Sequence, residues 1–539
     1  MNLSLAQRHR LLCLAASSGH LPSLDAALAH CGCTLTSGAL TSAAAGGSVA
    51  ACERLLGAGA PASCEVAAAA VGHMPVLRLL LDRTRLSKAE SSYTASCAAA
   101  ARAGQLPALQ LLLDSPASGA VRARVIRNSA AGACAGGQRE ILAWLQQAHG
   151  YSSSLGDAVA AARGGQVALL EQLLQQVLQP DRLESELASG GNAAKQPLYR
   201  RWIVLEAITA GCPVEVLQRH HDRLWSVAAN ANEARSEDAA AAEAAASSNK
   251  IRRQLLLATA GSGTACWGRK LDFFMSAWGP DGVARELQQR FDLTAFCNAA
   301  ALRPDYAQRL RRLHAAGMPL GVQALRYAAR FGHIDALKYL LDEAGAPAAA
   351  IDTAFVRSYV SERGPQLADS QLLRLLKERG YAFTAADVKA AARWGWPDEP
   401  LIALIQMAVD GGAEDANGSD WSAAFNYAAI GGASTCVLQA LRVRGAAVDL
   451  AAVAKGGSEE ALDWAAAELE AEGQGGSSDG GALLTPLRES EVQCVHERGN
   501  LAALHWLHRR GLLDGRSVSW LAGRVELGAA PAAAGGVER

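Results

Sequence analysis

The stretch GMPLGVQALRYAARFGHIDALKYLLDEAGAP, residues 317–347, decides the fold. Leu325, Ala328 and Ala329 are spaced three and four residues apart, so they lie on one face of a short helix. The alanines on that face allow another backbone to come close. Gly332 ends the helix, because glycine adopts the left-handed conformation of a helix terminus at little cost. This half of the stretch therefore predicts one short helix with a defined end.

The second half of the stretch predicts another helix. Residues 345–347, Gly-Ala-Pro, stop that helix and open a turn. The whole unit is two short antiparallel helices and a loop, and alone it cannot bury its apolar face. We therefore expect further units to stack on it. The apolar residues that repeat at helical spacing are Ile334, Leu337, Leu340 and Leu341.

The same pattern, A-x-x-G-x-x-x-x-L-x-x-[L or W], recurs along most of the chain. The first six glycines of the series are 28, 25, 32, 33 and 28 residues apart, which is the period of a stacked repeat array. A second glycine, at the end of the preceding helix, keeps a nearly fixed distance from the first: Gly317 lies fifteen residues before Gly332, and Gly150 fifteen before Gly165. The pattern glycines are Gly19, Gly47, Gly72, Gly104, Gly137, Gly165, Gly332, Gly395, Gly432, Gly457 and Gly499.

Composition agrees with an all-α chain. Half of the 539 residues are hydrophobic but only 5% are aromatic, which suits closely packed small helices better than one large core. Runs of alternating β-branched residues are sparse, so strands are not expected. The formal net charge of −1 provides no global field that would attract nucleic acid or a membrane. The fold class expected is an α-solenoid of helix-turn-helix repeats with an irregular helical middle.

The twelve cysteines form no C-x-x-C pair, and we expect them to be reduced core residues. Residues 7–10 interrupt the apolar start of the chain, which argues against a signal peptide. No window approaches the ~18 consecutive apolar residues of a membrane helix. We expect a monomeric cytoplasmic or nuclear protein that does not contact a membrane, with an organelle transit sequence left open.

The repeat register divides the chain into four regions. An N-terminal array spans 1–180, and degenerate repeats with an alanine-rich insertion span 181–300. A second array spans 301–525, and 526–539 forms a tail expected to be disordered. Within the middle region, 230–249 is either an exposed alanine-rich helix or a disordered insertion. Large apolar residues indicate that 266–290 packs into the array: Trp267, Phe273, Phe274, Met275 and Trp278.

The repeat resembles the ankyrin repeat, whose motif reads approximately T-P-L-H-x-A-A-x-x-G-H-x-x-x-V-x-x-L-L-x-x-G-A. The segment ALRYAARFGHIDALKYLLDEAGAP matches it from the alanine pair onward, and the resemblance covers about two-thirds of the chain. No unit keeps T-P-L-H: Arg326, Cys13, Val66 and Asn426 hold the histidine position. That departure implies looser loops without regular β-hairpins. The resemblance implies a scaffold that binds partners through its loop tips and the concave face of its first helices.

Two motifs partly match known phosphate-binding or metal-binding patterns. GSGTACWGRK, 261–270, superficially resembles a phosphate loop, and Gly263 and Gly268 have the right separation. Arg269-Lys270-Leu271 replaces the required Lys-[Ser/Thr], so we interpret the segment as a worn helical turn. His20, His30, Cys31 and Cys33 cluster near a loop, but no second ligand pair follows at zinc-finger spacing. We therefore expect no cofactor, metal-binding or catalytic residues.

Other polar residues are assigned to structure or surface. Three histidines that follow a helix-ending glycine are expected to be structural: His20, His73 and His333. Four others are expected at the solvated surface: His220, His221, His505 and His508. The charge clusters are interpreted as solvated outer helix faces, with contact to an acidic protein partner as the alternative for the basic ones. The basic clusters are Arg303, Arg309, Arg311, Arg312 and His314, and Arg200, Arg201, Arg219 and Arg223; the acidic one is Glu459, Glu460, Asp463, Glu468, Glu470 and Glu472.

The function expected is non-catalytic protein–protein binding, with a protein partner and no nucleic acid, since aromatic residues for base stacking are too few. Two alternatives stay open. One is an adaptor that recruits substrates to a larger machine such as a ubiquitin ligase. The other is an enzyme with its site in the irregular middle region, which a polar pocket with perturbed titratable groups would support and continuous helix stacking would oppose.

Overall fold

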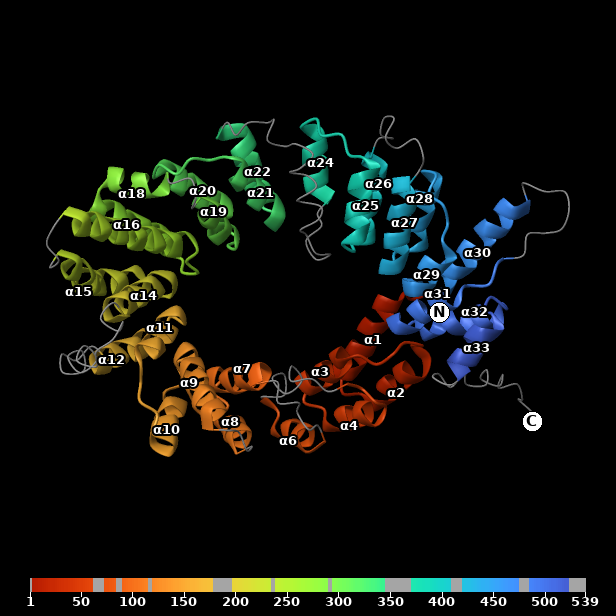
Figure 1. The fold of residues 1–539 in the computed structure, drawn as a ribbon, viewed down its shortest axis with the longest axis horizontal. Helices are drawn as coiled ribbons and strands as arrows, with labels where there is room; N and C mark the ends of the chain where they lie inside the picture. The colour runs from red at the N-terminus through yellow and green to blue at the C-terminus, as the bar shows by residue number, and fades with distance from the viewer. Residues whose placement is uncertain are drawn as a thin grey trace. The chain divides into compact units, whose positions relative to one another are not determined.

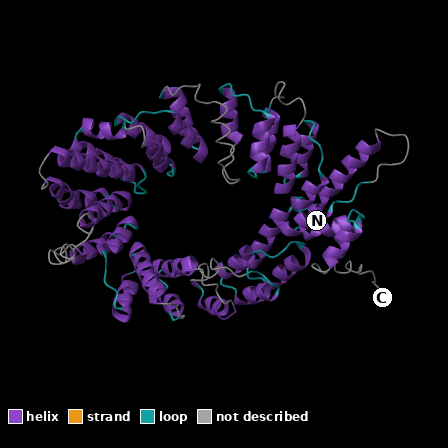
Figure 2. Cartoon of the chain, viewed as in Figure 1, coloured by secondary structure: helices purple, strands orange, loops and turns teal. Residues whose placement is uncertain are grey.

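The computed structural model describes residues 2–61, 72–83, 90–114, 119–177, 196–233, 238–288, 293–344, 370–408, 419–474 and 484–522. These residues are helical with short connections (Figures 1 and 2). The described residues contain no β-strand, only an isolated bridge between Leu487 and Leu513. This confirms the expected all-α class and the absence of regular hairpins in the described loops.

The chain forms two compact units, and their boundaries differ from the predicted domain boundaries. Unit 1 contains Met1–Pro61 and Ile351–Arg539, and unit 2 contains Ala62–Ala350. The helices of unit 1 are α1 (Leu5–Ser17), α2 (Leu21–His30), α3 (Ser37–Ala45), α4 (Val49–Gly57), α24 (Ser370–Glu378), α25 (Ala385–Arg393), α26 (Asp398–Met407), α27 (Ser419–Gly431), α28 (Thr435–Val443), α29 (Leu450–Gly456), α30 (Glu459–Gln474), α31 (Glu489–Arg498), α32 (Leu501–Arg509) and α33 (Gly515–Ala522).

Unit 2 contains the helices of the repeat at residues 317–347 and the whole described part of the middle region. Its elements are α6 (Met74–Arg83), α7 (Glu90–Arg102), α8 (Leu106–Leu113), α9 (Gly119–Gly136), α10 (Arg139–His149), α11 (Leu155–Arg163), α12 (Val167–Val177), α14 (Gln196–Gly211), α15 (Val214–Glu233), α16 (Asp238–Ala260), α17 (Trp267–Trp278), α18 (Pro280–Leu287), α19 (Leu293–Ala301), α20 (Tyr306–Ala315), α21 (Val322–Phe331), α22 (Ile334–Lys338) and the π-helical turn η3 (Tyr339–Glu343).

Within each unit, the first helix of one pair packs against the first helix of the next. In unit 2 this series runs α7, α9, α11, α14, α16, α19 and α21, without interruption through the region predicted to be irregular. In unit 1 the series α25, α27, α29 and α31 is accompanied by a second row, α24, α26, α28, α30 and α32. A helix pair that cannot bury its apolar face alone is therefore covered by its neighbours on both sides.

The first helix of the predicted repeat unit forms as expected, whereas the second consists of the short α22 followed by the π-helical turn η3. Gly332 ends α21 with φ of +72°, and Leu325, Ala328 and Ala329 are fully buried. Leu337 is also buried, in α22. The pattern glycines elsewhere adopt the same left-handed conformation, apart from Gly72 and Gly457. The predicted stop at 345–347 lies outside the described residues, as do the tail 526–539 and most of the glycine-rich loop near 475–483.

A glycine at the last position of a first helix explains how closely successive first helices pack. Gly136 and Gly456 are the last residues of α9 and α29. A Cβ at Gly136 would lie 2.0 Å from the carbonyl oxygen of Arg102, and one at Gly456 would lie 2.2 Å from that of Ile430. Real Cβ atoms do not approach a carbonyl oxygen this closely. A bare backbone at this position therefore sets the distance between successive first helices.

In unit 1, the first helix pair of the chain contacts the last complete pair (Figure 1). The buried guanidinium of Arg8 on α1 donates to Asn500 Oδ1 at 2.6 Å, and the backbone N–H of Thr34 donates to the carbonyl of Gly499 at 3.1 Å. Asn500 is fully buried and its amide also donates to a carbonyl of α29. The contact joins segments almost 500 residues apart, which local repeat periodicity could not predict.

The alanine-rich segment 230–249 is helical where it is described. Its backbone completes α15 as far as Glu233 and forms the first half of α16 from Asp238. The apolar residues that follow pack as expected, since Trp267 and Phe274 are buried in α17. The middle region therefore continues the helix packing of its neighbours.

Candidate functional site

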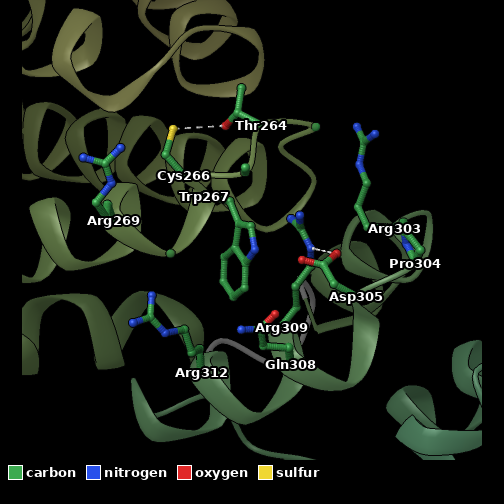
Figure 3. Close-up of a pocket in the computed structure, with 13 residues that line it drawn as sticks. Thr264, Cys266, Trp267, Arg269, Arg303, Pro304, Asp305, Gln308, Arg309 and Arg312 are labelled. Atoms are coloured by element: carbon green, nitrogen blue, oxygen red, sulfur yellow. Dashed lines mark hydrogen bonds and ion pairs between the residues drawn. The ribbon is translucent and has the colours of Figure 1, made fainter.

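A cavity of about 610 Å³ opens where the loop before α17 faces the start of α20 (Figure 3). The loop, 261–266, follows α16 and leads into α17 at Trp267. Pro304 and Asp305 precede α20 on the other side. The cavity is lined by one carboxylate, from Asp305, and by four arginines, Arg269, Arg303, Arg309 and Arg312. Arg269 is paired with Glu215 at 2.9 Å, and Arg312 lies 3.6 Å from Asp272, so the arginines give the cavity a modest excess of positive charge, which favours an anionic ligand.

Arg309 is the fixed element of this site. Only 3% of its surface is exposed, so its predicted place on a solvated outer face is wrong. Its Nε donates to Asp305 Oδ1 at 2.7 Å and its Nη1 to the carbonyl of Ala260 at 2.7 Å. The guanidinium lies 4.6 Å from the centre of the Trp267 ring. Burial lowers the pKa of Arg309, and the contacts with Asp305 oppose that shift.

The pKa of Asp305 is shifted by its ion pair with Arg309. Burial alone would raise the pKa of its carboxyl, but the hydrogen bond and charge of Arg309 outweigh burial and lower that pKa. The pair is four residues apart on one helical turn, which is the spacing at which side chains meet. The i, i+4 spacing was therefore a signal in the sequence, although the basic cluster masked it. The pair holds Arg309 in place and offsets its charge.

Arg303 and Arg312 are more accessible and lie on opposite sides of the cavity (Figure 3), Arg303 beside Gly263 of the loop and Arg312 beside Gly268 in the first turn of α17. Arg303 Nε donates to the carbonyl of Gly261 at 2.8 Å. Arg312 is about half exposed and its Nη1 lies 3.6 Å from Asp272 Oδ2. A Cβ on Gly268 would lie 1.9 Å from Arg312 Nη1, and one on Gly263 would lie 3.2 Å from Arg303 Nη1. The missing Cβ atoms of Gly263 and Gly268 thus leave the space that the two arginine side chains occupy.

Lys270, the lysine of the apparent phosphate loop, is fully buried. Its Nζ donates to the carbonyl of Thr209 at 2.6 Å, to Ser262 Oγ at 3.0 Å and to Thr264 Oγ1 at 2.8 Å. Burial lowers the pKa of this lysine to about 8. All three ammonium protons are directed to protein oxygens, so Lys270 orders the loop. The segment is a turn followed by a helix, as interpreted from the sequence, and does not use its lysine as a phosphate loop does.

The cysteine–histidine cluster near the N-terminus does not form a metal site in the structure. Cys31 and Cys33 are buried with their thiols 3.5 Å apart, whereas His30 is exposed. The hydrogen bond from Cys33 lowers the pKa of Cys31 to about 6. Across the described residues, no group of three or more His, Cys, Asp or Glu side chains could hold a metal ion.

His220 and His221 were predicted at the solvated surface, and that prediction is wrong. Both are buried in α15. His220 Nε2 lies 3.0 Å from both oxygens of Glu171 on α12, and His221 stacks on Trp225. Packing of α15 against neighbouring helices covers these rings, which the sequence of one helix could not show. His333 is structural as predicted, with Nε2 2.7 Å from the carbonyl of Ala301.

The remaining clusters belong to helix surfaces. In the acidic cluster, Glu459 pairs with Arg509 at 3.1 Å and Asp463 with Arg510 at 3.0 Å. His508 is exposed as predicted. In the other basic cluster, Arg219 pairs with Glu171 at 2.7 Å, and the side chains of Arg200 and Arg201 lie outside the described residues. Pairs of this kind, mostly exposed, have small energies and identify no site.

Comparison with known proteins does not assign the chain. No protein-family model matches it, and no curated protein matches it. Among the described helices, none is both long enough and apolar enough to span a membrane. The arginine-lined cavity is the candidate functional site.

Proposed function

We propose that the chain is a non-catalytic protein-binding scaffold, built as an α-solenoid of degenerate ankyrin-like repeats. The proposal is supported by the continuous series of first helices in each unit and by the left-handed glycines at the repeat positions. A stacked array of this kind displays loops along an extended surface, which suits recognition of another protein. The rigid helices supply the frame, and side chains at the loops supply the specificity.

The observation that carries the proposal is the cavity beside Trp267. Arg309 is fixed by Asp305 and by a backbone carbonyl, while Arg303 is half-buried and Arg312 is about half exposed. Arginine forks form paired hydrogen bonds with carboxylates. Because Arg303 and Arg309 are already held by hydrogen bonds to the protein, these two side chains lose less entropy on binding. We infer that an acidic segment of a protein partner docks here.

The hydrogen bonds of the titratable groups support binding rather than catalysis. Burial lowers the pKa of Lys270 in the middle region, where an enzyme site was the alternative, and the pKa of Arg309 just beyond that region. However, Lys270 Nζ donates three hydrogen bonds to protein oxygens and is fully buried. Arg309 is held by Asp305, whose own pKa is lowered and which therefore stays ionised. These groups stabilise the loop, and the proposal assigns them no reacting atom.

A photo-crosslinking experiment tests the proposed function. Gln308 is exposed and lines the cavity, so a photoreactive benzophenone amino acid placed there would contact the partner. We expect a covalent adduct with another protein, attached within an Asp- or Glu-rich segment. The same amino acid at exposed Gln439 on α28, in unit 1, serves as control. Adducts that are equal at both positions, or no protein adduct at Gln308, would contradict the proposal.

A further inference from the structure

Two cysteines meet in the loop between α2 and α3, at the contact between the first and last helix pairs of unit 1. Cys31 caps the C-terminus of α2, and Cys33 follows after Gly32. The thiol of Cys33 donates to Cys31 Sγ at 3.5 Å. Gly32 has φ of +52°, a left-handed turn that brings together side chains two residues apart. The two sulfur atoms are therefore in contact, and both cysteines are free.

A buried cation lies beside this pair. The guanidinium of Arg8 donates to the carbonyls of Cys31 at 2.9 Å and Gly32 at 2.8 Å. It also donates to Asn500 Oδ1 at 2.6 Å. None of these acceptors carries a charge, so the positive charge of Arg8 favours an anion close to it.

That anion is the thiolate of Cys31. The hydrogen bond from Cys33, helped by the charge of Arg8, lowers the pKa of Cys31 to about 6, while the same bond raises the pKa of Cys33. One thiolate and one thiol therefore face each other at neutral pH. A thiolate is the form of cysteine that peroxides oxidise, and a neighbouring thiol converts the product into a disulfide.

The pair lies just beneath a surface loop. Cys33 keeps 9% of its surface exposed and Cys31 3%, and the flanking residues His30 and Thr34 are exposed. Hydrogen peroxide is only slightly larger than water, so it needs a small opening. This burial excludes a large oxidant such as a mixed disulfide and leaves a peroxide as the oxidant that fits.

The same loop holds the first and last helix pairs together. The backbone N–H of Ala502, in α32, donates to the carbonyl of Gly32 at 3.0 Å. The backbone N–H of Thr34 donates to the carbonyl of Gly499 at 3.1 Å. A change in the backbone between residues 31 and 34 therefore acts directly on this contact.

A disulfide between the two cysteines would change that backbone. It would draw the sulfur atoms from 3.5 Å to about 2.05 Å and close a ring that includes both peptide groups of Gly32. The carbonyls of Cys31 and Gly32, which accept from Arg8 and Ala502, belong to these peptide groups. Oxidation also removes the thiolate beside the buried cation. Both changes weaken the contact.

We propose that Cys31 and Cys33 are a site of reversible oxidation by peroxide, and that the disulfide formed there loosens the contact between the first and last helix pairs of unit 1. The thiolate of Cys31 attacks one oxygen of hydrogen peroxide, which leaves a sulfenic acid on Cys31 and releases hydroxide. Cys33 then attacks the sulfenic sulfur, and its proton leaves with the hydroxyl group as water.

The two sulfur atoms together lose the two electrons that the peroxide gains. A dithiol reductant reverses the reaction by thiol–disulfide exchange. The inference is independent of the arginine-lined cavity, which lies in unit 2.

Differential alkylation of the full-length chain tests the oxidation. After treatment with hydrogen peroxide, free thiols are blocked with N-ethylmaleimide in denaturant, and the disulfides are then reduced and labelled with iodoacetamide. We expect fragment-ion mass spectrometry to place the iodoacetamide label on Cys31 and Cys33. Cys33→Ser should instead leave a sulfenic acid on Cys31 that dimedone, added with the denaturant, captures. Cys13→Ser, at a partly exposed position of α1, is the matched control and should leave the disulfide unchanged.

Hydrogen–deuterium exchange tests the effect on the contact. The amides of Thr34 and Ala502 donate across it. We expect both to exchange at least about tenfold faster after oxidation, since the loss of one charged hydrogen bond from Arg8 corresponds to such a factor. Dithiothreitol should restore the slow exchange, and Cys31→Ser should show no response to peroxide. The amide of His333, in unit 2, is the internal control and should not change.

Three outcomes would overturn the inference. If peroxide leaves Cys31 and Cys33 labelled by maleimide, the pair is not an oxidation site. If the iodoacetamide label appears on Cys13 and only one of the two, the pairing is wrong. If the disulfide forms but the amides of Thr34 and Ala502 exchange at the same rate as before, the loosening of the contact is wrong. The comparison of the intact chain with and without peroxide needs no variant, so the result does not depend on how the variants fold.

Discussion

Replacing Gly456 with alanine tests the close packing of successive first helices. In unit 1, Gly456 ends α29 and Gly431 ends α27, so the two glycines hold the same place in consecutive repeats. A Cβ on Gly456 would lie 2.2 Å from the carbonyl oxygen of Ile430 and 2.8 Å from that of Ala429. A Cβ on Gly431 meets nothing within 4 Å. The same substitution should therefore have opposite effects at the two positions.

The magnitudes follow from two terms. Alanine is preferred over glycine in a helix by about 0.8–1 kcal/mol, and this gain applies at both positions. Overpacking at Gly456 costs about 1–3 kcal/mol, because the backbone of α27 has to move away. We expect Gly456→Ala to lower the free energy of unfolding by up to about 2 kcal/mol and Gly431→Ala to raise it by up to about 1 kcal/mol.

Thermal unfolding followed by circular dichroism measures both variants. The two variants differ by the overpacking cost of about 1–3 kcal/mol, so at about 2–4 °C per kcal/mol for a domain of 150–250 residues their melting temperatures should differ by about 2–12 °C. Equal melting temperatures would refute the reasoning. So would stabilisation by Gly456→Ala, because the first helices would then not approach at this distance.

Three further predictions concern buried groups. Asn500→Ala should destabilise unit 1 by about 3 kcal/mol, because it removes a helix cap and the acceptor of the buried Arg8 guanidinium. Urea unfolding should show this loss, while the control Gln493→Ala, at an exposed position, should stay within about 0.5 kcal/mol of wild type. A smaller loss for Asn500→Ala would contradict the contact between the first and last helix pairs. Lys270 releases its proton at pH about 8 when folded and at about 10.4 when unfolded, so the unfolded state holds more protons between these values. The free energy of unfolding, relative to Lys270→Met, should rise by about 3 kcal/mol from pH 8 to 10.5 in denaturant titrations, and a pH-independent difference would show that Lys270 is not buried. Gly332→Val should lower the melting temperature, since φ of +72° strains a β-branched residue, and an unchanged melt would exclude the left-handed turn.

Local features of the repeat could be predicted from the sequence. Helical spacing identified the buried face of α21, and glycine at 332 identified its end, because both depend on residues within one turn. The same applies to the absence of strands among the described loops, since the histidine motif that ties ankyrin loops together is missing. The packing role of the last helical residue was not predicted, although the sequence shows it as paired glycines. In Gly136-Gly137 and Gly456-Gly457 the first glycine allows the close approach of the neighbouring helix, and the second lies just beyond the helix.

Long-range features could not be predicted. Nothing in the sequence around Arg8 indicates that its partner is Asn500, because the contact depends on how repeats are placed in unit 1. The burial of His220 and His221 likewise depends on neighbouring helices. At the candidate site, the basic cluster was recognised but assigned to solvent, because the loop that covers Arg309 comes from residues about 45 positions earlier.

The central claim is that the arginine-lined cavity binds a protein partner. The most direct measurement is quantitative affinity purification with the intact chain, with the double variant Arg303→Gln/Arg312→Gln and with the control Arg326→Gln. We predict a partner that is enriched equally by the intact chain and the control and is lost with the double variant, and whose binding weakens as salt is raised. The claim is contradicted if the double variant, folded as judged by its melting curve, retains every partner of the intact chain.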